Sequence, residues 1–198
     1  MRIVREGTDV TKHAPGWLAR AIRWSAAIVA AVVVGAIGLT GTALANFPHI
    51  KTASVTTVAP PAGPASLTSG QVTATLPDLL FTWTEVGLGN TNVNYIFSTN
   101  VTVTFGCVNN GSNHPNATNK TTVTEQPTGS KTLPVDKNGN VSSSFELPIG
   151  TVSSPAGFSC PQGQTAEALS ATFAGNTITD TTNNVSVTLG DIVVTLGP

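Results

Sequence analysis

From residue 71 onward, apolar and polar residues alternate with a period of two. Alternation over short runs rich in Val, Thr and Phe is typical of half-buried β-strands, and the Gly, Pro and Asn between the runs are typical of turns. The runs predict strands with these inward-facing residues: Val72, Ala74 and Leu76; Val93, Tyr95 and Phe97; Val101, Val103 and Phe105; Val141, Phe145 and Leu147; and Val185, Val187 and Leu189.

Two further segments complete the predicted fold. Residues 166–173, "AEALSATF", have the best helical composition of this region, but their alternation favours a strand with Leu169, Ala171 and Phe173 on one face. Residues 191–196, "DIVVTL", are more continuously apolar, which is typical of a central strand. About eight short strands predict an all-β, antiparallel two-sheet sandwich of the Ig-like, Greek-key type. A sheet closed on itself is the alternative.

The first 45 residues differ from the rest of the chain. They contain every arginine, followed by the uncharged apolar run "AAIVAAVVVGAIGLTGTALA". A basic segment, an apolar segment and the Ala43-x-Ala45 pattern predict a helical signal peptide that is cleaved after Ala45, and therefore a secreted or envelope-associated protein. An uncleaved anchor is the alternative, because residues 24–45 are long enough to cross a bilayer. In both cases only this segment meets the membrane, and the remainder is exported.

The exported part divides into two predicted regions. Residues 46–70 contain four prolines and almost no charge, which predicts an extended spacer or a disordered tail. Residues 71–198 are then one β domain. Within it, Asn138-Gly139 favours a hairpin turn, because Asn-Gly supplies two positive φ angles. The tract "TDTTNN", residues 179–184, predicts a polar turn.

Charge and polar composition narrow the possible partners. The exported part has more acidic than basic residues and no arginine, which makes it a poor partner for nucleic acid or anionic lipid. A protein or a polysaccharide at the cell surface is the predicted partner. Thr-x-Thr pairs recur at residues 73/75, 82/84, 102/104 and 122/124, and their irregular spacing favours ordinary solvent-facing strand positions over the regular array of a flat ice-binding face.

The chain has two cysteines, Cys107 and Cys160, both in the exported part. An even count in an oxidising compartment predicts a disulfide between them. A metal site would need further ligands, and neither His49 nor His114 has ligand spacing with a cysteine. We therefore predict no metal site and no cofactor. The polar tract after Cys107 is predicted to be an ordered loop held by the disulfide.

Four strings suggest a relationship: "TWTEVGLGN", "FGCVNNGSNHPNATNK", "GFSCPQGQ" and "TDTTNNVSV". Together they resemble a group of small secreted actinobacterial β-sandwich proteins of no established function. The resemblance spans about residues 82–188. It implies secretion and a β fold, and it implies no catalytic residue.

No common catalytic motif is present: there is no G-x-S-x-G, no H-E-x-x-H and no phosphate-binding loop. We therefore predict a non-catalytic structural or interaction module. A carbohydrate-binding module is one alternative, and it would expose Trp83 or Tyr95 for sugar stacking, whereas core packing is the other role for these rings. A secreted hydrolase is a second alternative, which would need carboxylates that converge in a cleft. The candidates are Glu85, Glu125, Glu146 and Asp180.

Overall fold

The computed structural model describes residues 47–59, 71–109 and 119–196 of the 198-residue chain. Within these ranges the protein is all-β, and every strand pair is antiparallel, which confirms the predicted all-β, antiparallel character of the fold. In the same ranges, no helix is long and apolar enough to cross a membrane. The predicted signal peptide with Ala43 and Ala45, and most of the polar tract after Cys107, including His114, lie outside the described residues.

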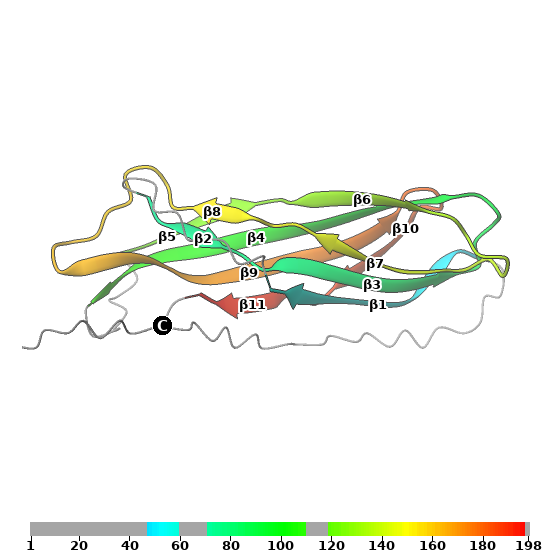
Figure 1. Ribbon diagram of the computed structural model, residues 1–198, viewed down its shortest axis with the longest axis horizontal. Coiled ribbons are helices and arrows are strands. Elements are labelled where there is room, and N and C mark those ends of the chain that lie inside the picture. The colour runs from blue at the N-terminus through cyan, green and yellow to red at the C-terminus, as the bar shows by residue number, and fades with distance from the viewer. Residues whose placement is uncertain (1–46, 60–70, 110–118, 197–198) are drawn as a thin grey trace, which may run out of the picture.

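The largest sheet is built on two long strands, β4 (Val93–Asn109) and β9 (Gln164–Asp180), which pair along most of their length (Figure 1). Two short strands line each outer edge of this central pair, so the sheet is four strands wide. Along β4 these are β6 (Thr128–Leu133) and β5 (Lys120–Glu125), and along β9 they are β10 (Val185–Leu189) and β11 (Ile192–Thr195).

The second layer consists of a three-stranded sheet and a short two-stranded sheet. Leu76 N donates a hydrogen bond to Gly150 O at 3.0 Å between them, so the short sheet continues the second one. Pro77 and Pro148 interrupt the regular pairing, because proline has no backbone N–H to donate. The three-stranded sheet has the order β1 (His49–Val58), β3 (Asp78–Val86), β7 (Val141–Leu147), and the short one pairs β2 (Thr73–Thr75) with β8 (Thr151–Ser153).

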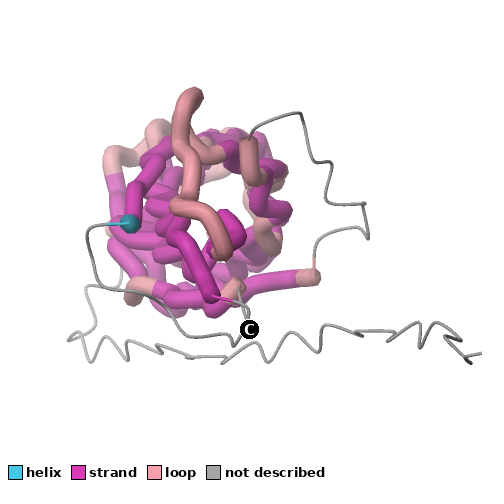
Figure 2. Tube along the Cα trace, turned by 90° about the vertical axis from the view of Figure 1, so that its left-hand side faces the viewer, coloured by secondary structure: helices cyan, strands magenta, loops and turns pink. Residues whose placement is uncertain are grey.

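Aromatic side chains from the two larger sheets meet in the core. The ring of Phe97 on β4 lies 5.4 Å from Phe81 on β3 and stacks at 4.4 Å on Phe145 of β7. Burying a ring of this size contributes about 2 kcal/mol or more. These contacts show that the two sheets pack face to face, and along the long axis the strands surround a rounded core (Figure 2).

One strand lies where the sequence predicted a spacer. β1 falls within residues 46–70, pairs with β3, and buries Ile50 and Val55 in the core. The prolines that dominate this segment flank the strand, while the run between Pro48 and Pro60 contains none and is rich in Thr and Val. The spacer prediction is therefore wrong for β1, and the β domain begins before residue 71.

The C-terminal strand is at an edge of the sheet. β11 pairs with β9 alone, whereas its apolar composition predicted a central strand. Ile192 and Val194 are buried, but Val193 faces outward and is 59 % exposed. The continuous apolar run therefore reflects one outward-facing valine, and the prediction of a central strand is wrong.

The Asn138-Gly139 segment forms a tight turn but not a hairpin. Gly139 N donates to Asp136 O at 3.0 Å, and Gly139 has a φ of 75°. The flanking strands β6 and β7 belong to different sheets, however, so the turn passes the chain from one layer to the other. A dipeptide determines the local turn, and the pairing of the strands on either side depends on their other neighbours.

A disulfide joins Cys107 and Cys160, as predicted, with their Cα atoms 5.6 Å apart. It ties the end of β4 to the segment that precedes β9, the strand that pairs with β4. The bond therefore holds together the last part of the longest ladder.

Replacing both cysteines by serine should lower stability. The bond closes a loop of 53 residues, which corresponds to about 4 kcal/mol when the entropy of the unfolded chain is considered alone. Denaturant titration of the oxidised protein and of the double variant measures the difference. Adding a reductant should destabilise the native protein and leave the variant unchanged, and equal stability of the two proteins would contradict this role.

Gly129 should tolerate no side chain. A Cβ atom at this position on β6 would lie 2.6 Å from Cε1 of the Phe145 ring, which packs between the layers. Gly129→Ala should therefore destabilise the fold by about 1–3 kcal/mol through overpacking. Gly89→Ala is the matched control, since nothing lies within 4 Å of its added Cβ atom. Thermal unfolding should show a clear drop in Tm for the first variant only.

Candidate functional site

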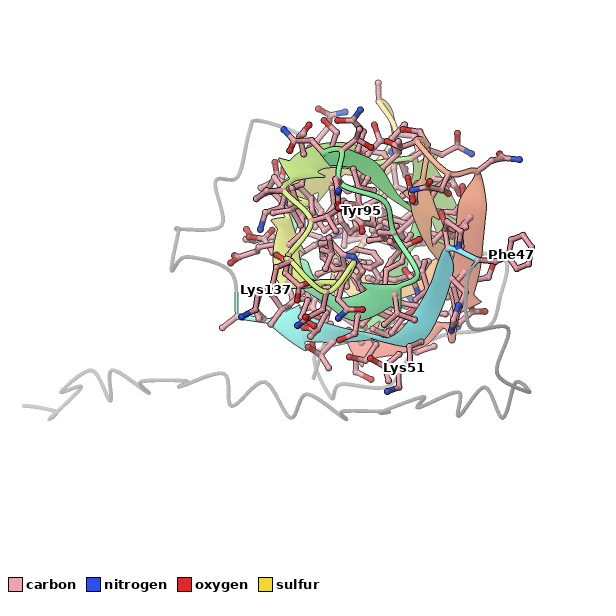
Figure 3. The ribbon with its side chains drawn as sticks, turned by 90° about the vertical axis from the view of Figure 1, so that its right-hand side faces the viewer. Phe47, Lys51, Tyr95 and Lys137 are labelled. Carbon is pink, nitrogen blue, oxygen red and sulfur yellow. A yellow bond between two sulfur atoms is a disulfide. The ribbon has the colours of Figure 1, made fainter. Side chains whose placement is uncertain are left out.

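Three ionisable side chains meet at one end of the fold, where β3 ends, β4 begins and β9 ends. They are Glu85, Tyr95 and Asp180, and all three are fully buried. Tyr95 and Asp180 are direct partners in the β4–β9 ladder. Figure 3 looks onto this end and shows Tyr95 inside the ring of strands, whereas Lys51 and Lys137 lie at its periphery.

Glu85 is bound on one side by aromatic residues. The Tyr95 hydroxyl donates a 2.8 Å hydrogen bond to Glu85 Oε2. Trp83, two residues before Glu85 on the same face of β3, packs its ring 4.8 Å from that of Tyr95. The second oxygen, Glu85 Oε1, and the indole Nε1 of Trp83 are buried without a hydrogen-bond donor or acceptor partner. An unpartnered buried polar atom costs about 1–3 kcal/mol, so this arrangement lowers the stability of the folded state.

Asp180 is held by the turn between β9 and β10. Its carboxylate accepts hydrogen bonds from Thr182 N at 2.7 Å, Asn183 N at 3.1 Å and Asn183 Nδ2 at 2.6 Å. Asn184 completes the turn with a φ of 57°, a conformation that asparagine tolerates better than most residues. The "TDTTNN" tract is thus the predicted polar turn, and Asp180 organises it from within the core.

Burial determines the protonation of Glu85. It raises the pKa of Glu85 to about 7, and the charge of nearby Asp180 adds to the rise, while the Tyr95 hydrogen bond opposes it. Asp180 is within hydrogen-bonding reach of Glu85, so a protonated Glu85 can donate to it. The proton then supplies a partner for the otherwise unpartnered oxygen. Burial also raises the pKa of Tyr95, which keeps its hydroxyl protonated as the donor to Glu85.

The loop after β3 fits closely against its neighbours and closes this end. Leu88 is buried, and its N–H donates to Gly139 O at 2.9 Å. A Cβ atom at Gly139 would lie 2.6 Å from Leu88 O, and one at Gly87 would lie 2.4 Å from Phe47 O. Both positions therefore require glycine. The carboxyl pair has no opening to solvent in this conformation.

An open hollow of about 420 Å³ lies beside this end, along the chain that passes from β6 to β7. One of its lining residues, Val141, pairs with Glu85 across the β3–β7 ladder. Asp136 is the only carboxylate among the described residues that line the hollow. Its Oδ1 accepts hydrogen bonds from Asn138 N and Asn140 N, which stabilise the turn at Asn138-Gly139. The hollow is lined by Leu133, Pro134, Val135, Asp136, Asn140, Val141 and Ser142.

The structure places the predicted site residues as follows. Trp83 is 1 % exposed and Tyr95 is 0 % exposed, so both rings pack in the core. Neither offers a face for sugar stacking, which the carbohydrate-binding alternative had required. Glu85 and Asp180 converge, as the hydrolase alternative required, but in a closed core and not in a cleft. Glu125 and Glu146 are exposed at positions on other strands.

The sequence placed Glu85 and Asp180 among four candidate carboxylates but did not single them out as the pair, although it holds a signal for each. Glu85 continues the inward series Phe81 and Trp83, and Asp180 follows Ile178 at the same spacing. A carboxylate at an inward position of a strand predicts a buried acid. The strand pairing that brings the two acids together has no local signature.

Among the described residues, no group of three or more His, Cys, Asp or Glu side chains could hold a metal ion. Comparison with protein families, with curated proteins and with solved structures finds no match. The chemistry of the chain's own surfaces and buried groups is therefore the guide to function.

Glu85 should make the protein less stable as pH rises. The folded state keeps a proton on Glu85 up to about pH 7, whereas the unfolded chain loses it near pH 4.5. The free energy of unfolding should thus fall between these two values and then level off, by at most about 3 kcal/mol. Glu85→Gln should remove this fall, because an amide cannot ionise and its NH₂ group can donate to Asp180.

Urea titrations from pH 4 to pH 8 measure this effect as the difference between the native protein and the variant. Glu146→Gln, at an exposed position of β7, is the matched control and should keep the native pH profile. A Glu85→Gln protein with an unchanged profile would show that the pair does not share a proton.

Proposed function

We propose that this protein is a non-catalytic structural or interaction module that is exported and acts outside the cell or at the cell envelope. The observation that carries the proposal is the outer face of the largest sheet. This face has no charged side chain in its rows; most of its residues on the edge strands are exposed, and most of those on β4 and β9 are half-buried. It offers a partner a broad surface, whereas the converging carboxylates lie in the closed core.

Strand pairing arranges most of this outer face in four rows that run across the sheet, with Asn100 and Ala174 between the second and the third. We call these rows the hydroxyl face, because Thr and Ser supply nearly all of their residues. Neighbouring residues in each row are partners in the strand ladders. The rows are Ser130, Ile96, Thr179 and Ser186; Thr128, Ser98, Thr177 and Thr188; Thr124, Thr102, Thr172 and Val193; and Thr122, Thr104, Ser170 and Thr195.

The core beneath the hydroxyl face supports a role as a rigid platform. The residues that alternate with its rows on β4, such as Phe97, Val101 and Val103, are fully buried. The disulfide holds one end of the β4–β9 ladder, and the turn organised by Asp180 closes the other. Packing of the two larger sheets against each other supports the two-sheet sandwich expected from the sequence.

Export is supported by two features. A disulfide is typical of oxidising compartments. The basic and apolar leader with Ala43 and Ala45 fits a secretory signal peptide. A hydrolase is the second candidate, favoured by the convergence of Glu85 and Asp180, and it would require the loop after β3 to open.

A charge placed in the hydroxyl face should abolish the protein's cellular role. Thr172→Lys places an ammonium group on β9 in the middle of the face. Thr82→Lys is the control, since Thr82 occupies the central strand of the other larger sheet and faces outward; it is exposed, whereas Thr172 is half-buried. Both variants should unfold within a few degrees of the native protein, because solvent-facing substitutions change stability little.

The cellular role is measured by complementation of cells that lack the gene. The amount of each variant in the medium and in the envelope fraction is assayed at the same time. Thr172→Lys should fail to complement, and Thr82→Lys and Glu85→Gln should complement. Loss of the cellular role in Glu85→Gln at an unchanged Tm would overturn the proposal in favour of the hydrolase.

A further inference from the structure

We infer that the hydroxyl face binds an uncharged polysaccharide. This inference rests on the proposed function and names the partner of the same surface. It is carried by three properties of the face: six of its fourteen hydroxyl groups are hydrogen-bonded across the strands, its rows lack charge, and its two apolar side chains lie far apart.

Three hydrogen bonds across the strands hold six of the fourteen hydroxyl groups of the face. Ser98 and Thr177 are bonded at 2.6 Å, Thr102 and Thr124 at 3.0 Å, and Thr179 and Ser186 at 3.0 Å. Threonine is also restricted at χ1 by its branched Cβ. Each hydroxyl keeps spare capacity to donate or accept, so the face can bond a partner without first losing much side-chain freedom.

The absence of charge selects the class of partner. No member of the four rows is ionisable, and the nearest charged residues of the sheet stand at its margins. An acidic or basic polymer would gain no electrostatic attraction from this face. A neutral polymer with many hydroxyl groups can match its donors and acceptors. The marginal residues are Glu125 and Asp191 at the edges, and Lys120 and Glu167 at the disulfide end.

Two aliphatic side chains give the face apolar contacts. Ile96 is 44 % exposed and Val193 is 59 % exposed, and among the described residues only one other large hydrophobic, Phe47, is comparably exposed. Ile96 lies in the first row, on β4, and Val193 lies in the third row, two strands away. The rows are separated by the six residues from Ile96 to Thr102, so the two side chains are on the order of 20 Å apart by strand geometry. A single sugar cannot touch both. A chain of sugars that crosses the face diagonally can lay its C–H surfaces on each.

Other occupants fit this surface less well. The cores of protein interfaces are enriched in aromatic residues, Met and Arg, and the hydroxyl face contains none of these. A second copy of the chain would bring hydroxyl rows against hydroxyl rows without charge complementarity. A rigid crystalline surface would need a flat face, and β-sheets twist by about 20° per strand. A flexible glycan chain can follow that twist.

Sedimentation with insoluble polysaccharides tests the inference on the secreted protein. The probes are acid-swollen cellulose, chitin and an insoluble β-1,3-glucan, with polygalacturonate gel as the charged comparison. At least one neutral probe should remove the native protein from solution, equally at low and high salt, because no charge is involved. Thr172→Lys should weaken this binding by about tenfold or more, as expected for a change in the centre of an interface. Thr82→Lys should bind as the native protein does.

Three results would overturn the inference. The folded native protein could fail to bind every neutral probe, Thr172→Lys could bind as well as Thr82→Lys, or light scattering could show a dimer that Thr172→Lys dissociates. None of these results contradicts the proposed function if Thr172→Lys still fails to complement in cells. In that case the face has a partner other than a neutral polysaccharide.

Discussion

The antiparallel ladder between β4 and β9 is the constraint on which the rest of the structure depends. Each strand has 17 residues, and nearly all backbone hydrogen bonds of the central sheet run through this pair or along its edges. Its inward side supplies Phe97, Val101 and Phe173 to the core. The same register sets Tyr95 opposite Asp180 at one end and aligns the outward hydroxyls in rows. Two β-bulges, after Ser98 and after Thr104, let strands of this length keep one apolar face while they twist.

The buried pair of Glu85 and Asp180 lies where the β4–β9 ladder ends. A strand end leaves backbone N–H groups of the following turn without partners, and Asp180 satisfies two of them from inside the core. That placement brings a negative charge beside Glu85, which a closed apolar core disfavours. A proton on Glu85 relieves the conflict, since it removes one charge and supplies a hydrogen bond at the same time. The pair is therefore explained by structural needs of the turn and the core, and catalysis is not required to account for it.

The sequence predicted the elements far better than their arrangement. Alternation identified the inward residues of β4 and β7, and the cysteine count identified the disulfide, because both signals are local or countable. β1 was missed because proline-rich flanks masked a strand of ten residues. β11 was misplaced because composition does not show which edge of a strand is paired. The Thr-x-Thr pairs are irregular along the chain, yet strand register sets two of them, 102/104 and 122/124, side by side in the rows of one sheet. Register depends on contacts between distant segments, so neither the rows nor the Glu85–Asp180 pair could be derived from the sequence alone.

Hydroxyl groups also explain how a chain with so few charges can have a broad, hydrated polar surface. Threonine on the solvent side of a strand favours the extended backbone through its branched Cβ, and its hydroxyl forms hydrogen bonds with water. It therefore contributes both to the stability of the sheet and to its solubility. A lysine or glutamate in the same rows would add solubility but would also introduce long-range fields and a dependence on salt. With the ionisable groups confined to the core, the margins and the turns, the hydroxyl face has nothing to titrate. Its contacts with a neutral partner should then be insensitive to pH. The free energy of unfolding, in contrast, should change with pH because Glu85, beside Tyr95, ionises. The two properties are physically separate because they belong to opposite sides of the same strands.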